Sequence, residues 1–169
     1  TINIDPDAET LAETAALVAD MVQEMGIQPR VAMLSFSNFG DAHHPLAQKV
    51  ARATKLAKKL RPGIEIEGEM QADVALQSEM RAPYPFSDLT GPANILVFPN
   101  LAAGNIAYKL LGATGSEVIG PMVLGTRQPV NVVQQGANVS SVVHMTTLTV
   151  ARAIQLSRAT RGAEPAEAT

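Results

Sequence analysis

The 169-residue chain contains no cysteine and no tryptophan, and only 17% of its residues are charged. Without cysteine there can be no disulfide, thiolate metal site or cysteine nucleophile. A net charge of −3, with no face rich in lysine and arginine, argues against nucleic-acid binding. No apolar run reaches the roughly 18 residues of a membrane span, and the acidic N-terminal region is unlike a signal peptide. We therefore expect a cytoplasmic protein that binds small molecules, with no nucleic-acid or membrane partner.

The shortage of charge also makes a prediction about assembly. Globular chains are usually about 25% charged, whereas this chain is 46% hydrophobic. Its length corresponds to one domain with a substantial core. We expect part of the surface to be an interface, either between subunits or with another domain, and we expect the chain not to be a monomer.

Strand-like and helix-like patterns alternate along most of the chain. Asp5 and Pro6 predict the start of the first helix, as its cap and its first residue. The predicted helices cover 9–25, 46–60, 70–80, 102–111 and 139–160, and Lys49 is placed on the solvent side of the second. The predicted strands cover 1–5, 31–34, 64–68, 95–98, 118–119, 122–124 and 130–133. This alternation predicts an α/β fold with a largely parallel sheet, whose ligands bind beyond the carboxyl ends of the strands.

A polar loop follows the predicted strand 31–34. Ser35, Ser37, Asn38 and Gly40 offer hydroxyl groups, an amide and backbone N–H groups just before a helix. Such donors suit an anion such as phosphate. The same residue types also make ordinary turns and caps, and no Walker or GxGxxG spacing is present. Both interpretations stay open.

A second candidate group follows the strand 95–98. Asn105 and Lys109 are four residues apart and therefore share one face of the predicted helix. A lysine on the ligand side of the sheet could bind a phosphate group. It could equally be an ordinary surface lysine.

Two further groups have simple alternatives. The adjacent His43 and His44 point in different directions on a helix and make a poor metal pair, so capping or solvation is the simpler interpretation. Glu67, Glu69 and Asp73 could serve acid–base chemistry or a divalent ion, or could complement a helix dipole.

Several blocks of the chain resemble the phosphate acetyl/butyryltransferase family. They occur in the family's order over roughly residues 1–157. The blocks are 30–40, 67–73, 75–76, 93–101, 104–110, 119–121 and 129–131. The resemblance implies a three-layer αβα fold with a largely parallel sheet, like the second domain of phosphotransacetylase and the isocitrate/isopropylmalate dehydrogenases.

Within the family, the sequence of these blocks is most similar to the C-terminal transferase-like module of bacterial hybrid NADP-dependent malic enzymes. Active transferases carry a Ser-Thr-Lys-Gly-style loop where this chain has Ser37-Asn38-Phe39-Gly40. The family's ligand site also implies acyl-CoA or phosphate contacts from Gly120, Pro121 and the loop near residue 135.

That last loop departs from the family's catalytic pattern. Active transferases have a Ser-Arg-Gly triplet followed by an aspartate base, whereas this chain has Gln134-Gln135-Gly136 and, at the aspartate's position, Ser141. The arginine would neutralise developing charge and the aspartate would deprotonate the CoA thiol. The resemblance therefore implies no catalytic residue here, although Gln134 and Gln135 could still donate hydrogen bonds to an acyl-CoA.

The implied function is an acetyl-CoA-sensing and oligomerisation module of an NADP-dependent, oxaloacetate-decarboxylating malic enzyme, with acetyl-CoA as effector. NADP and a divalent metal would belong to the parent enzyme, and this chain would carry no metal or cofactor. One alternative is part of an active phosphate acetyl/butyryltransferase, and another is a purely structural dimerisation module.

The resemblance also implies a domain organisation. Residues 1–124 would form the second α/β domain with an N-terminal crossover helix. Residues 125–160 would return to pack on a first domain that this chain does not contain. Residues 161–169 would be a disordered tail. A homodimer or higher homo-oligomer is the expected assembly.

Overall fold

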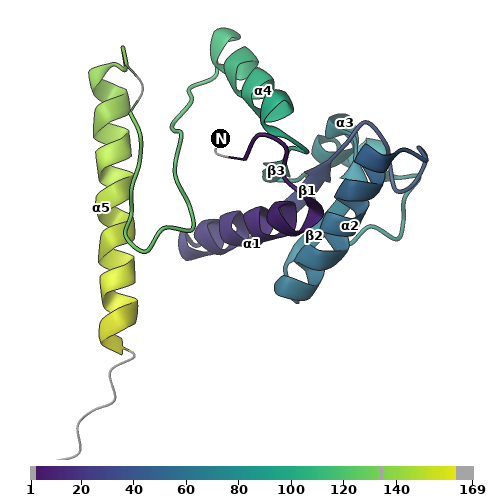
Figure 1. Cartoon of the computed structure of the whole chain (residues 1–169), viewed down its shortest axis with the longest axis horizontal. Coiled ribbons are helices and arrows are strands. Elements are labelled where there is room, and N and C mark those ends of the chain that lie inside the picture. Colours follow the sequence, from purple (N-terminus) through teal and green to yellow (C-terminus); the bar gives the residue numbers. More distant parts are fainter. Residues whose placement is uncertain (1–2, 134, 163–169) are drawn as a thin grey trace, which may run out of the picture. The chain divides into compact units, whose positions relative to one another are not determined.

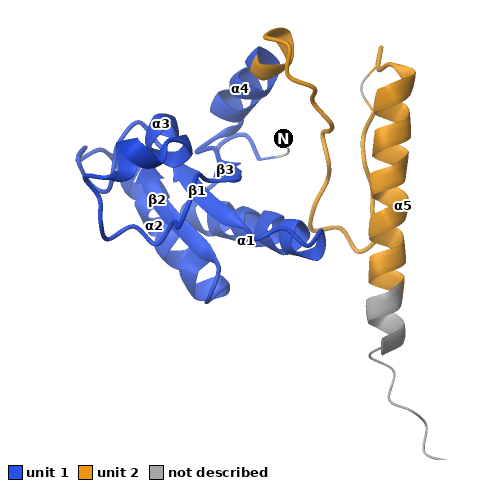
Figure 2. Cartoon of the chain, turned by 180° about the vertical axis from the view of Figure 1, so that it is seen from behind, with its two compact units in different colours: residues 1–110 blue, residues 111–169 orange. Residues whose placement is uncertain are grey.

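The computed structural model describes residues 3–133 and 135–162. It divides into two compact units, 1–110 and 111–169, coloured separately in Figure 2. The boundary expected near residue 124 falls inside the second unit. Of the predicted disordered tail 161–169, residues 161–162 belong instead to the last helix, and 163–169 lie outside the described residues. The predicted N-terminal strand is not formed by residues 3–5, and residues 1–2 lie outside the described residues.

The first unit is built on a three-stranded parallel sheet. Its strands are β1 (Arg30–Leu34), β2 (Glu65–Met70) and β3 (Ile95–Val97), in the order β2-β1-β3. Its helices are α1 (Ala8–Glu24), α2 (Pro45–Leu60), the short α3 (Ala72–Leu76), the 3₁₀ turn η1 (Ser78–Arg81) and α4 (Leu101–Ala113), which continues into the second unit (Figure 1). The predicted α/β class with a parallel sheet is confirmed.

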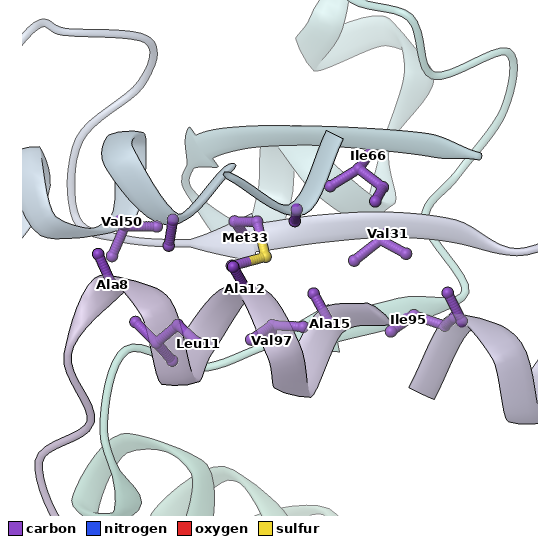
Figure 3. Packing of buried hydrophobic residues seen from close by; sticks show 13 residues of the cluster. Ala8, Leu11, Ala12, Ala15, Val31, Met33, Val50, Ile66, Ile95 and Val97 are labelled. Carbon is purple, nitrogen blue, oxygen red and sulfur yellow. The ribbon is translucent and has the colours of Figure 1, made fainter. Parts of the chain in front are cut away.

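The sheet is buried on both faces, which explains the unbroken apolar runs of β1 and β3. Val31 and Met33 face a core cluster with α1 and α2, while Ala32 and Leu34 belong to a second cluster with α3. Figure 3 shows the first cluster, in which small alanines of α1 lie against side chains of the strands. Alanine at these positions lets the helix approach closely and costs little side-chain entropy.

Two local predictions about helices were wrong. The cap of α1 is Asp7, not Asp5, because the Asp7 carboxylate accepts a hydrogen bond from the N–H group of Thr10 at 2.8 Å. Lys49 is not on a solvent face, since its side chain is only 17% exposed and donates to Asp5 at 2.8 Å and to the carbonyl of Pro99 at 3.2 Å. Asp5 lies ahead of the helix and forms an ion pair with Lys49 instead of capping α1.

The predicted helix 70–80 and the late strands also differ from expectation. Strand β2 continues to Met70, so the helical part shrinks to α3 and η1. Between 118 and 133, only an isolated antiparallel bridge joins Met122 to Asn131. The Asn131 side chain accepts from the N–H group of Val123 and donates to Thr149, so local side-chain bonds replace a strand ladder there.

The second unit contains α5 (Val139–Gly162), close to the predicted helix 139–160. Its threonines weaken the sequence-based prediction of a helix because they are β-branched. In the structure the hydroxyl groups of Thr146, Thr147 and Thr149 donate to carbonyls four residues earlier. No helix of the described chain is long and apolar enough to cross a membrane.

An ion pair between α1 and Arg61, the residue that ends α2, predicts how stability changes in acid. Arg61 donates two hydrogen bonds to Asp20, at 2.6 and 2.5 Å, and these hold the pKa of Asp20 below its ordinary value of 3.8. Because the folded-state pKa is lowered, this contribution to stability is present above pH 3.8 and is lost as pH falls below it.

We expect Asp20→Asn to lower the urea midpoint at pH 6 and to lie closer to the wild-type midpoint at pH 3, because the contribution of the ion pair declines as pH falls below 3.8. The effect should be small, because the pair is more than one-third exposed and is screened by solvent. Asp41→Asn, an exposed aspartate, is the control. An equal difference between Asp20→Asn and wild type at both pH values would contradict the assignment.

Candidate functional site

The candidate site lies at the carboxyl edge of the sheet, where the polar loop 35–40 follows β1. The loop is fixed by the segment that ends β2. Ser35 and Phe39 donate backbone N–H groups to the carbonyls of Met70 and Glu69, at 2.9 and 2.8 Å. The side-chain amide of Gln71 donates to the carbonyl of Phe36 at 2.8 Å. Two segments about 30 residues apart in the sequence therefore form one hydrogen-bonded unit.

Two of the predicted anion-binding side chains are used inside this unit. Ser37 and Asn38 are 2% and 8% exposed. The Ser37 hydroxyl donates to the Glu69 carboxylate at 2.9 Å and accepts from the N–H group of Ala42 at 3.0 Å. The Asn38 side-chain oxygen accepts from the N–H group of Gln71 at 2.8 Å. These bonds match the capping and turn interpretation of the sequence.

Ser35 and Gly40 are at the surface of the same loop. Ser35 is half-buried and Gly40 is exposed, with the backbone N–H of Gly40 donating to Glu69 at 2.7 Å. Aromatic rings cover the other side of the loop: Phe39 lies 4.8 Å from Tyr84 and 5.0 Å from Phe86, between ring centroids. Phe86 is 63% exposed, so the loop offers aromatic surface as well as polar atoms.

The three clustered carboxylates do not act together. Glu67 is paired with Lys58, Glu69 is bonded to the loop, and the Asp73 carboxylate accepts from the N–H group of Val74 in the first turn of α3. The described residues contain no group of three or more histidine, aspartate or glutamate side chains placed to hold a metal ion. The pattern of acidic residues therefore has structural explanations.

The histidine pair also has a structural explanation. His44 is the cap residue of α2, and its ring Nδ1 accepts from the N–H group of Leu46 at 3.2 Å. Its ring also lies edge-on to Phe36, 5.6 Å between centroids. His43 is exposed.

The second candidate group lies on α4, which follows β3 at the same edge of the sheet. Asn105 and Lys109 are both exposed, and the Lys109 ammonium lies 5.2 Å from the centre of the Tyr108 ring. Asn105 lines a hollow of about 460 Å³ together with Ile4, Leu101 and Ala102. Sequence patterns missed Lys49, whose ammonium lies at this edge against the Pro99 carbonyl.

The remaining candidates belong to the second unit. Gly120 and Pro121 are half-buried and joined by a cis peptide bond, and Gln135 is exposed. Ser141 lies in the first turn of α5, where both its N–H group and its hydroxyl donate to the side-chain oxygen of Asn138. Gln134 lies outside the described residues. The structure thus describes two groups of candidates in the first unit and further candidates in the second.

Comparison with known proteins identifies the family to which this chain belongs. The profile of the family described as "Phosphate acetyl/butaryl transferase" matches residues 1–150. The chain therefore belongs to the phosphate acetyl/butyryltransferase family, as its sequence blocks predicted.

Individual relatives are of two kinds. The chain is 43% identical over 155 residues to the NADP-dependent malic enzyme of Escherichia coli (strain K12), covering 90% of this chain and 20% of the enzyme. It is 42% identical over 155 residues to the phosphate acetyltransferase of Bacillus subtilis (strain 168), covering 90% and 48%. The chain thus spans half or less of the length of these relatives.

Solved structures support the fold. A phosphotransacetylase from Streptococcus pyogenes is similar with a TM-score of 0.85 and 38% identity, over 92% of this chain and 48% of that chain. The EutD phosphotransacetylase from Staphylococcus aureus is similar with a TM-score of 0.84 and 37% identity, over 90% and 48%. The predicted phosphotransacetylase-like α/β fold is confirmed.

Proposed function

We propose that this chain is the acetyl-CoA-sensing and oligomerisation module of an NADP-dependent malic enzyme and that it lacks transferase activity. Overall identity does not separate this role from an active transferase, because it is 43% to a malic enzyme and 42% to a phosphate acetyltransferase. The proposal rests on two positions, Gln135 and Ser141, where the family's pattern implies arginine and aspartate.

The chemistry of these two positions supports binding without catalysis. Ser141 presents a hydroxyl group, which is no general base at neutral pH, and that hydroxyl donates to Asn138 at 2.9 Å. Gln135 is exposed and uncharged, so it can donate a hydrogen bond to an acyl-CoA but cannot neutralise charge in a transition state. NADP and a divalent metal would be bound by other parts of the parent enzyme.

Exposed apolar side chains support the oligomerisation part of the proposal. On α4, Ile106 and Leu110 are each 59% exposed, and Val139 at the start of α5 is 81% exposed. Burial of such side chains against a first domain or a second subunit would be favourable, at about 25 cal/mol per Å² of apolar surface. The same observation favours the alternative of a purely structural dimerisation module, so ligand binding must be measured directly.

Calorimetry with acetyl-CoA tests the sensing role on the complete gene product that contains this chain. We expect saturable binding below millimolar ligand, weakened at least about fivefold by Lys109→Gln, because an ammonium–phosphate contact contributes on the order of 1 kcal/mol at an exposed site. Lys55→Gln removes an equally exposed charge from α2 and should leave affinity unchanged. Absence of binding at millimolar acetyl-CoA would overturn the sensing role and favour the structural alternative, because an active phosphate acetyltransferase must also bind acetyl-CoA.

An assay of CoA acetylation from acetyl phosphate tests the transferase alternative on the same gene product. We expect a rate at least about 10³-fold below that of an active phosphate acetyltransferase, because loss of a general base alone costs about 10²–10⁴-fold. The Bacillus subtilis phosphate acetyltransferase is a suitable positive control. Turnover at its rate would replace our proposal with the alternative of an active phosphate acetyl/butyryltransferase.

A further inference from the structure

Glu69 occupies an irregular position in the sheet. Met33 of β1 pairs with Gly68 and Leu34 pairs with Met70, so Glu69 is an extra residue with no partner in the ladder. An extra residue of this kind redirects the side chains around it. The Glu69 side chain is buried, with the residue only 2% exposed, at the end of β2 beside the loop that follows β1.

The Glu69 carboxylate is bonded to the donors that make the loop look like an anion site. One carboxylate oxygen accepts from the Ser37 hydroxyl at 2.9 Å and from the Gly40 N–H group at 2.7 Å. The Glu69 carbonyl accepts from the N–H group of Phe39 at 2.8 Å, and Ser37 in turn accepts from Ala42. Hydrogen bonds to a charged acceptor are stronger than neutral ones.

We propose that Glu69 is a positioning residue of the acyl-CoA site, whose buried carboxylate fills the anion-binding nest of the loop 35–42 and so fixes the loop's conformation. The inference rests on the proposed acetyl-CoA function. An external phosphate would then not bind through Ser37 and Gly40, because the protein's own carboxylate holds those donors. The loop contributes its shape and its exposed side chains to ligand binding.

Glu67 provides a matched control within the same strand. It is also buried, with the residue 4% exposed, but its carboxylate is paired with Lys58. Replacing either glutamate removes one buried negative charge from β2. Only replacement of Glu69 removes an acceptor from the loop.

The test combines hydrogen exchange of the segment 37–42 with acetyl-CoA calorimetry, on the complete gene product. Glu69→Leu should speed exchange in this segment by about tenfold or more, as expected for loss of hydrogen bonds to a buried acceptor, and should weaken acetyl-CoA binding by a similar factor. Glu69→Gln keeps an oxygen able to accept both bonds, so both quantities should stay within about threefold of wild type. Glu67→Gln should leave both unchanged.

Rescue by glutamine separates positioning from general destabilisation, and Ser37→Ala serves if Glu69→Leu does not fold. Ser37→Ala should speed exchange at Ala42 and weaken binding in the same direction. The proposal would be overturned if Glu69→Leu showed wild-type exchange and wild-type affinity. Where Glu69→Leu does not fold, the same result in Ser37→Ala would overturn it. Effects of Glu67→Gln as large as those of Glu69→Leu would also overturn it. If wild type binds no acetyl-CoA, the proposed function fails, and unchanged exchange in these variants would still separately refute the role of Glu69 in fixing the loop.

Discussion

Replacing Gly68 with alanine should destabilise the chain by about 3 kcal/mol or more, since overpacking against rigid backbone belongs to the most damaging class of substitutions. Gly68 has a φ of 146°, and a Cβ atom there would lie 2.6 Å from the carbonyl oxygen of Met33 and 2.8 Å from its Cβ. Those atoms belong to the neighbouring strand β1, so the two strands would have to separate. Urea unfolding monitored by circular dichroism measures the effect.

Gly63→Ala is the matched control for Gly68→Ala. Gly63 also has a positive φ, of 89°, but an added Cβ meets nothing within 4 Å. It should cost only about 1 kcal/mol, from backbone strain alone. Equal losses in the two variants would show that strain, and not the contact with Met33, makes Gly68 necessary.

The second large effect is expected at Arg81. Its guanidinium is buried and donates to the carbonyls of Val74, Ala75 and Gly91, at 3.2, 3.2 and 2.7 Å. Methionine keeps much of the volume but removes the guanidinium donor from all three carbonyls, of which that of Ala75 still accepts from the N–H group of Ala93 at 2.9 Å. We expect Arg81→Met to lose about 2–4 kcal/mol in urea unfolding and to make the segment 82–93 more susceptible to limited proteolysis.

Two variants define the cause of the Arg81 effect. Arg81→Lys keeps the charge but cannot span three acceptors with a planar fork, so it should restore only part of the stability. Arg52→Met removes an exposed arginine paired with Glu9 and should cost less than about 1 kcal/mol. Full stability in Arg81→Met would contradict this prediction. It would mean that water satisfies the carbonyls that the guanidinium bonds in the wild-type protein.

Local patterns were sufficient for most of the first unit. The apolar run from Val31 to Leu34 specified a strand buried on both faces, and the amphipathic spacing after Pro45 specified α2. The first signal is continuous burial over a short run, and the second is burial repeated at the helical period. The sequence blocks were sufficient for the family, which the match over residues 1–150 confirms.

Predictions failed where a residue's partner is distant in sequence. Lys49 has the spacing of a solvent-facing lysine, but Asp5 and the Pro99 carbonyl hold it at the edge of the sheet. The segment 118–133 has the composition of strands, but a strand also needs a neighbouring strand with which to form backbone hydrogen bonds. In this segment, side-chain hydrogen bonds of Asn131 to Val123 and Thr149 replace that backbone pairing.

The absence of cysteine by itself excluded a disulfide, a thiolate metal site and a cysteine nucleophile. The ordered sequence blocks determined the family. Only the tertiary structure decided whether the donors of the polar loop are open to an external anion or are bonded within the protein. Ser37 and Gly40 have the composition of an anion site, but the irregular register of β2 brings the Glu69 carboxylate to their donors. A hydrogen-bond donor is specified locally, whereas its acceptor is chosen by the packing of strands 30 residues apart.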